Sequence, residues 1–166
     1  MRFDLRNFLE SAKTPYTTHI SVDLSQSDFD GFTVPEPAKV SFEATPTMEG
    51  VSMTLQINAE VATECARCLT PIRETYEFTR EYLVRQRDLE DPDMELPLEA
   101  DGCLNVEELV YQEMIFQVPR VLLCSPDCPG LCPICGKSKK AGCTCRSAEE
   151  PAPVDARLSI LKQLLS

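Results

Sequence analysis

Eight of the nine cysteines fall into four close pairs, a spacing that is typical of metal ligands. Two pairs are separated by two residues, one by three residues and one by a single residue. Zinc prefers four ligands in a tetrahedron, and thiolates two residues apart reach one ion from a single tight turn. Two all-cysteine sites need eight thiolates. We therefore predict zinc ligands at Cys65, Cys68, Cys124, Cys128, Cys132, Cys135, Cys143 and Cys145.

The spacing alone leaves open which pairs share a site. In the preferred scheme, the pair Cys65–Cys68 joins the pair Cys124–Cys128. The last four cysteines then form a self-contained site, because they close only a short loop. The alternative is a single four-cysteine site with spare thiols, and the non-metal interpretation is disulfides or buried thiols. Cys103 stands alone before a predicted helix and is interpreted as a small hydrophobic residue.

The cellular compartment of the protein helps to decide between metal ligands and disulfides. The chain has 166 residues, and 43% hydrophobic residues argue against wholesale disorder. The first fifteen residues carry charges at Arg2, Asp4 and Arg6 and lack the apolar stretch of a secretory signal. The sequence contains no run of 18 apolar residues, so no membrane span is predicted. We therefore expect a cytoplasmic protein with no membrane partner. Disulfides rarely persist in the cytoplasm, so paired cysteines there favour metal binding.

Strict alternation of apolar and polar residues predicts an antiparallel sheet in the first half of the chain. The clearest strand is 51–61, where six apolar residues alternate with polar ones. After the turn at Cys65–Cys68, alternation continues over 72–84, so these two strands form a hairpin with cysteines at its tip. Further strands are expected at 16–24 and 39–45, and a short helix at 4–12.

The second half of the chain predicts helices around the cysteine-rich segment. Asn105 is expected to cap a helix over Val106–Gln117, with Glu108 completing a capping box. Leucines after Asp155 predict a last amphipathic helix. The sequence thus predicts an α+β fold, with an antiparallel β-sheet, a few helices and a C-terminal Cys-rich zinc module. The expected parts are the sheet region 1–87, an acidic linker or loop 88–101, and 102–166 with the helices and zinc module packed on the sheet as one domain.

Catalytic interpretations fit the sequence poorly. A thioredoxin-like active site opens a helix, whereas Cys65 and Cys68 lie between two predicted strands. A catalytic zinc site keeps an open position and usually uses histidine, but the single histidine, His19, falls in the middle of a predicted strand. No HExxH, GxSxG, Walker or GxGxxG pattern occurs. We therefore predict a protein that is not an enzyme. The alternatives are a metal-dependent RNA-processing enzyme and a cysteine-based redox or zinc sensor.

The charge distribution bears on the partner. The formal charge of −11 argues against a large basic face for nucleic acid and favours a basic protein partner. A local exception is a group of basic residues around the last four cysteines, which we call the basic fringe. It is a candidate contact for RNA phosphates, or it offsets the negative charge of the zinc thiolates. Its residues are Lys137, Lys139, Lys140 and Arg146.

Several segments together resemble the YceD-like family of large ribosomal RNA subunit accumulation proteins, found in bacteria and chloroplasts. They are DLRNFL (4–9), CARCLTPI (65–72), LNVEELVYQEMIFQVP (104–119), CSPDCPGLCPICG (124–136), CTC (143–145) and DARL (155–158). The last segment departs from the family pattern, since Ala156 stands where the family favours proline. The resemblance implies a role in the accumulation of large-subunit ribosomal RNA and in ribosome assembly. Its implied partners are precursor ribosomal RNA or large-subunit assembly proteins.

Overall fold

The computed structural model describes residues 1–91 and 94–145. The chain divides into two compact units, residues 1–128 and residues 129–166. The first unit holds the sheet and both α-helices of the described residues. The second contains, in its described part, the short 3-10 helix η2 (Lys139–Ala141) and four cysteines. The predicted helix after Asp155 lies outside the described residues.

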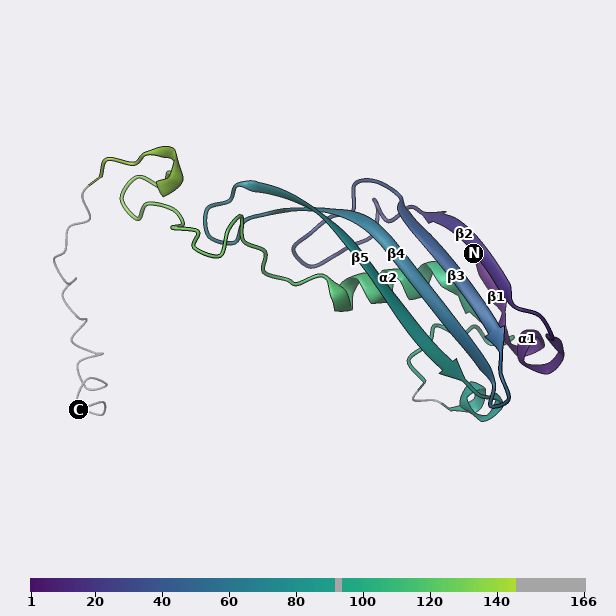
Figure 1. Ribbon diagram of the computed structural model, residues 1–166. Coiled ribbons are helices and arrows are strands. Elements are labelled where there is room, and N and C mark those ends of the chain that lie inside the picture. The colour runs from purple at the N-terminus through teal and green to yellow at the C-terminus, as the bar shows by residue number, and fades with distance from the viewer. Residues whose placement is uncertain (92–93, 146–166) are drawn as a thin grey trace, which may run out of the picture. The chain divides into compact units, whose positions relative to one another are not determined.

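The first unit is built on a four-stranded antiparallel sheet with the order β2-β3-β4-β5 (Figure 1). Its strands are β2 (Tyr16–Val22), β3 (Ala38–Pro46), β4 (Val51–Glu64) and β5 (Pro71–Val84). β4 and β5 form the predicted hairpin and pair along their whole lengths, from Val51 opposite Val84 to Glu64 opposite Pro71. Alternate apolar side chains of β4 are buried, as period-2 patterning requires.

The helix α2 (Val106–Gln117) covers the apolar face of this sheet (Figure 1). Asn105 caps it, because its side chain accepts a hydrogen bond from the Glu108 amide at 3.2 Å. Leu109, Val110 and Met114 are buried in the same hydrophobic cluster as the inward-facing residues of β3 and β4. The bounds of this helix and its cap are those expected from the sequence.

A second, two-stranded sheet lies beside the first. It pairs β1 (Arg2–Asp4) with β6 (Cys103–Asn105), and between them in sequence α1 (Leu5–Ser11) begins at its cap Asp4. The ring of Phe3 packs edge-on against Phe42, with centroids 5.0 Å apart. The sequence analysis missed both strands, because three residues are too few to show alternation. Burial raises the pKa of Cys103, in keeping with its interpretation as an apolar residue.

The acidic segment 88–101, expected as a linker or loop, contributes apolar side chains to the core. Its first residues belong to the 3-10 helix η1 (Gln86–Glu90), and Leu98 forms an isolated bridge with Leu104. Met94, Leu96 and Leu98 are half-buried against the core.

None of the helices that the structure describes is long and apolar enough to cross a membrane. The predicted α+β fold, with an antiparallel sheet, a few helices and a C-terminal cysteine-rich module, is confirmed.

Candidate metal centres

The structure brings eight cysteines together in two groups of four, and each group lies within one unit. In each group the four Sγ atoms lie within 4.8 Å of one another. The hairpin site consists of Cys65, Cys68, Cys124 and Cys128. The C-terminal site consists of Cys132, Cys135, Cys143 and Cys145. This is the grouping of the preferred scheme, and Cys103 belongs to neither group.

The hairpin site joins two segments that are far apart in sequence. Cys65 and Cys68 lie at the tip between β4 and β5, while Cys124 and Cys128 come from the segment after α2. Two hydrogen bonds hold these segments together. The Ala66 amide donates to the Leu122 carbonyl at 3.0 Å, and the Arg67 guanidinium donates to the Cys128 carbonyl at 3.2 Å.

The sulfur spacing of the hairpin site fits one tetrahedral ion. The Sγ–Sγ distances are 3.5 Å for Cys68–Cys124, 3.6 Å for Cys124–Cys128 and 3.7 Å for Cys65–Cys128. A tetrahedral zinc ion with Zn–S bonds of about 2.3 Å requires sulfurs about 3.8 Å apart. A disulfide requires about 2.0 Å. The donor set therefore fits a soft, thiolate-preferring metal ion and not a pair of disulfides.

The two CxxC turns have the same backbone conformation. In the first, the Cys65 amide donates to the Thr70 carbonyl and the Leu69 amide to the Cys65 carbonyl, both at 2.9 Å. In the second, the Cys132 amide donates to the carbonyl of Lys137 at 2.8 Å, and the amide of residue 136 donates to the Cys132 carbonyl at 2.9 Å. The residue after the second cysteine is left-handed in both turns, with φ of 58° at Leu69 and 70° at Gly136.

Backbone amide groups are directed at the leading sulfur of each CxxC pair, from the turn itself and, at Cys65, also from Cys124 of the other segment. The amides of Cys124, Arg67 and Cys68 lower the pKa of Cys65 to about 6. The amides of Cys135 and Ile134 lower the pKa of Cys132 to about 6 in the same way. Hydrogen bonds to the charged form favour that form. Both turns therefore stabilise a thiolate, which is the form that binds a metal.

Leu69 is the residue of the hairpin site that the sequence analysis missed, and it supplies a direct test of this turn. Left-handed backbone costs a non-glycine residue about 1–2 kcal/mol, and the Leu69 side chain is 56% exposed, so packing contributes little. Leu69→Gly is expected to raise the free energy of unfolding by about 0.5–1 kcal/mol, after the greater entropy of glycine in the unfolded chain is subtracted. Urea denaturation measures this change. Leu69→Ala is the matched control and should give no gain. A loss of stability in Leu69→Gly would contradict the turn.

The C-terminal site is the more exposed of the two. Cys132 is buried, but Cys135 and Cys145 are exposed. The sulfurs of Cys135 and Cys143 lie 3.5 Å apart. Hydrogen bonds with the thiols of Cys143 and Cys135 raise the pKa of Cys145 to about 12. Four clustered thiols cannot all ionise without a counter-charge, so a full set of thiolates here needs a bound cation.

Three of the four residues of the basic fringe lie in the described part of the structure, close in sequence to the ligands of the C-terminal site. Lys137 follows the CxxC turn, and Lys139 and Lys140 lie in η2; all three side chains are exposed. The Lys139 amide donates to the Gly130 carbonyl at 3.0 Å, which closes a small loop together with the bridge between Leu131 and Ser138. Arg146 lies outside the described residues.

The fold and the site together define a class of protein: an α+β protein that carries two four-cysteine groups with the spacing of tetrahedral metal sites. Residues 53–165 match the family described as "Large ribosomal RNA subunit accumulation protein YceD". The chain belongs to this family. The matched region contains all eight paired cysteines, and the resemblance seen in the sequence is confirmed.

The chain is also similar to mycobacterial proteins that are described as uncharacterized. One from Mycobacterium tuberculosis and one from Mycobacterium bovis are each 33% identical over 92 residues, covering 53% of this chain and 44% of theirs. One from Mycobacterium leprae is 24% identical over 106 residues, covering 61% of this chain and 49% of its own. The chain thus spans about half the length of the curated relatives it matches. No solved structure matches.

Proposed function

We propose that this protein is a non-enzymatic, zinc-binding factor that supports the accumulation of large-subunit ribosomal RNA and the assembly of the ribosome in the cytoplasm. The single observation that carries the proposal is membership of the accumulation-protein family. The two four-cysteine groups support the zinc-binding part, since they offer four thiolates each at tetrahedral spacing.

The proposed ligands are the four cysteines of the hairpin site and the four of the C-terminal site. Four thiolates close the coordination of a zinc ion, and a closed site is structural because no position remains for water or substrate. His19 is exposed in β2 opposite Ser41 and contributes to neither group. In this proposal, zinc holds the two CxxC turns in shape, and the protein acts by binding a partner and not by catalysing a reaction.

The exposure of Cys135 and Cys145 favours a second candidate function, that of a redox or zinc sensor. Exposed thiolates are open to oxidation, which releases the metal. The two candidates differ in one respect. A sensor loses zinc from the C-terminal site under mild oxidant and changes its binding as a result, whereas a structural site does neither.

The partner is proposed to be precursor ribosomal RNA or a large-subunit assembly protein, reached through the basic fringe in the case of RNA. Replacing Lys137, Lys139 and Lys140 together with glutamate is expected to abolish cross-linking to precursor ribosomal RNA and to leave zinc binding intact. Three lysines neutralise few phosphates, so binding of the unchanged protein should show only a shallow dependence on salt. Cross-linking followed by RNA sequencing measures the loss.

A control variant with the same change of charge is Lys13→Glu with Lys39→Glu and Arg87→Glu, whose side chains are exposed in the first unit. It should cross-link as the unchanged protein does. Unchanged cross-linking in the fringe variant would rule out the fringe and favour an assembly protein as the direct partner.

The proposed function itself is tested by depleting the protein from cells. An unchanged ratio of large-subunit to small-subunit ribosomal RNA after depletion would contradict it.

A further inference from the structure

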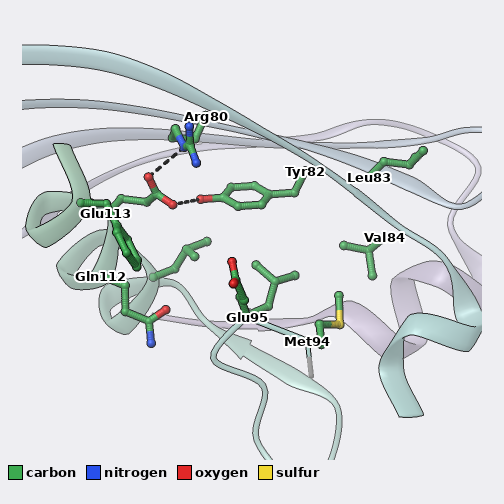
Figure 2. Close-up of a pocket in the computed structure, with 11 residues that line it drawn as sticks. Arg80, Tyr82, Leu83, Val84, Met94, Glu95, Gln112 and Glu113 are labelled. Atoms are coloured by element: carbon green, nitrogen blue, oxygen red, sulfur yellow. Dashed lines mark hydrogen bonds and ion pairs between the residues drawn. The ribbon is translucent and has the colours of Figure 1, made fainter. Parts of the chain in front are cut away.

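A pocket of about 340 Å³ opens beside β5 on the sheet face that α2 covers (Figure 2). Its walls come from the last residues of β5, one side of α2 and the segment 94–96. Its volume lies at the lower end of the range for ligand pockets, about 300–1,000 Å³, which suits a single side chain. The pocket shares no residue with either cysteine group.

A buried carboxylate forms the inner wall of the pocket. Glu113 of α2 is only 5% exposed, and its Oε1 accepts a hydrogen bond from the Tyr82 hydroxyl at 2.7 Å. Its Oε2 lies 2.9 Å from Nε of Arg80 but receives no well-directed hydrogen bond. A buried charge is costly unless it is paired and hydrogen-bonded. Glu113 therefore retains the capacity to accept a further donor.

A second carboxylate faces the same space. Glu95 points into the pocket towards the Tyr82–Glu113 pair in Figure 2, and no ion pair of Glu95 occurs among the described residues. The pocket thus holds two carboxylates against the single cation Arg80, whose side chain is about half exposed on the edge of the sheet. This imbalance attracts a positively charged group and repels phosphate.

Apart from Gln112, the remaining walls are apolar. Val84, Leu109 and Leu96 line the pocket, and at its rim Phe116 is 76% exposed. A long basic side chain matches this arrangement, because its methylene stem packs on apolar walls while its charged head reaches the carboxylates. The Tyr82 ring lies beside the carboxylates, and a planar guanidinium stacks on an aromatic ring better than an ammonium does. Arginine therefore fits better than lysine.

The strand next to the pocket offers a backbone partner. β5 is an edge strand of the four-stranded sheet in the part of the chain that the structure describes, and it runs for fourteen residues. The unpaired N–H and C=O groups of an edge strand form a template for another extended chain. Tyr82 and Val84 lie at alternate positions of this strand, so a strand added to the edge presents alternate side chains to the pocket.

The net charge of the first unit also favours a basic partner. Residues 1–128 contain 24 acidic and 10 basic residues, a formal charge of −14, while residues 129–166 carry a formal charge of +3. A field of this sign steers basic proteins towards the first unit. We propose that an extended segment of a basic partner protein pairs with the edge of β5 and places an arginine side chain in the pocket between Glu113 and Glu95.

The proposal goes beyond the proposed function, since it can be tested without any ribosomal component. The probe is an acetylated and amidated nonapeptide of alternating valine and threonine with one central arginine, labelled for fluorescence anisotropy and added to the full chain. We expect it to bind. Replacing the arginine by citrulline, its neutral isostere, should weaken binding about tenfold or more, because charge-assisted hydrogen bonds are lost. Methylating alternate backbone amides should weaken binding similarly, because strand pairing is lost.

Glu95→Gln is expected to weaken binding of the arginine peptide about tenfold. The matched control is Glu81→Gln, which removes the same charge from the opposite face of β5 and should change binding less than twofold. Equal binding of the arginine and citrulline peptides would overturn the proposal, and so would an unaffected Glu95→Gln variant. A single-stranded RNA probe that competes with the peptide and is retained in Glu95→Gln would also overturn it, in favour of a nucleic acid.

Discussion

Replacing Cys132 and Cys135 together with serine is expected to remove one zinc ion per chain and to unfold residues 129–145, while the sheet of the first unit stays folded. In the described part of the second unit, only Gly130 and Cys132 are buried, so this segment has no hydrophobic core of its own. A small zinc site contributes about 10–16 kcal/mol of apparent binding free energy, which is then folding free energy. Nothing else in these residues compensates for its loss.

The measurement is zinc content by mass spectrometry together with amide hydrogen exchange. Protection should disappear at Gly136 and Lys139, whose amides donate to the Cys132 and Gly130 carbonyls. Protection in β4 should be unchanged, because its core of alternate apolar residues does not include a metal ligand. Persistent protection at residues 136 and 139 in the metal-free variant would contradict a metal-dependent fold. Loss of protection throughout β4 would contradict the independence of the sheet.

The elements predictable from the sequence are those with a strong local signal. β4 was found because six inward positions alternate without interruption, and α2 because Asn105 and Glu108 mark its first turn. β1 and β6 were missed because each has three residues and is stabilised by pairing with a partner about a hundred residues away. Such pairing has no local pattern to detect.

The same distinction applies to the candidate site. The CxxC spacing predicts a metal-binding turn. Glycine is the residue that most readily adopts the left-handed backbone found at 136, whereas Leu69 gives no such signal at the equivalent position of the first turn. Only the repeated hydrogen bonds of the two turns reveal the equivalence. The ion pair of Arg80 with Glu113 was also invisible, because it joins β5 to α2 across 33 positions of sequence.

Replacing Cys65 and Cys68 together with serine is expected to remove the other zinc ion and to lower the free energy of unfolding of the first unit by about 4 kcal/mol or more. Cys65, Cys68 and Cys128 are buried, so loss of the ion leaves buried thiols and hydroxyls without their common partner. The hairpin tip and the segment 122–128 are held together by this site and by two hydrogen bonds. Urea denaturation followed by far-UV circular dichroism measures the change, and zinc analysis should show one ion per chain.

Cys103→Ser is the matched control for both cysteine variants, because Cys103 lies in β6 and outside both groups. It should retain two zinc ions per chain and lose far less stability than the hairpin-site variant. The two double variants should also differ from each other. The hairpin-site variant shifts the unfolding of the sheet, because its ligands fix the end of the β4–β5 hairpin, whereas the C-terminal variant leaves the sheet transition in place. Two zinc ions and an unshifted transition in Cys65→Ser with Cys68→Ser would show that these cysteines are not ligands.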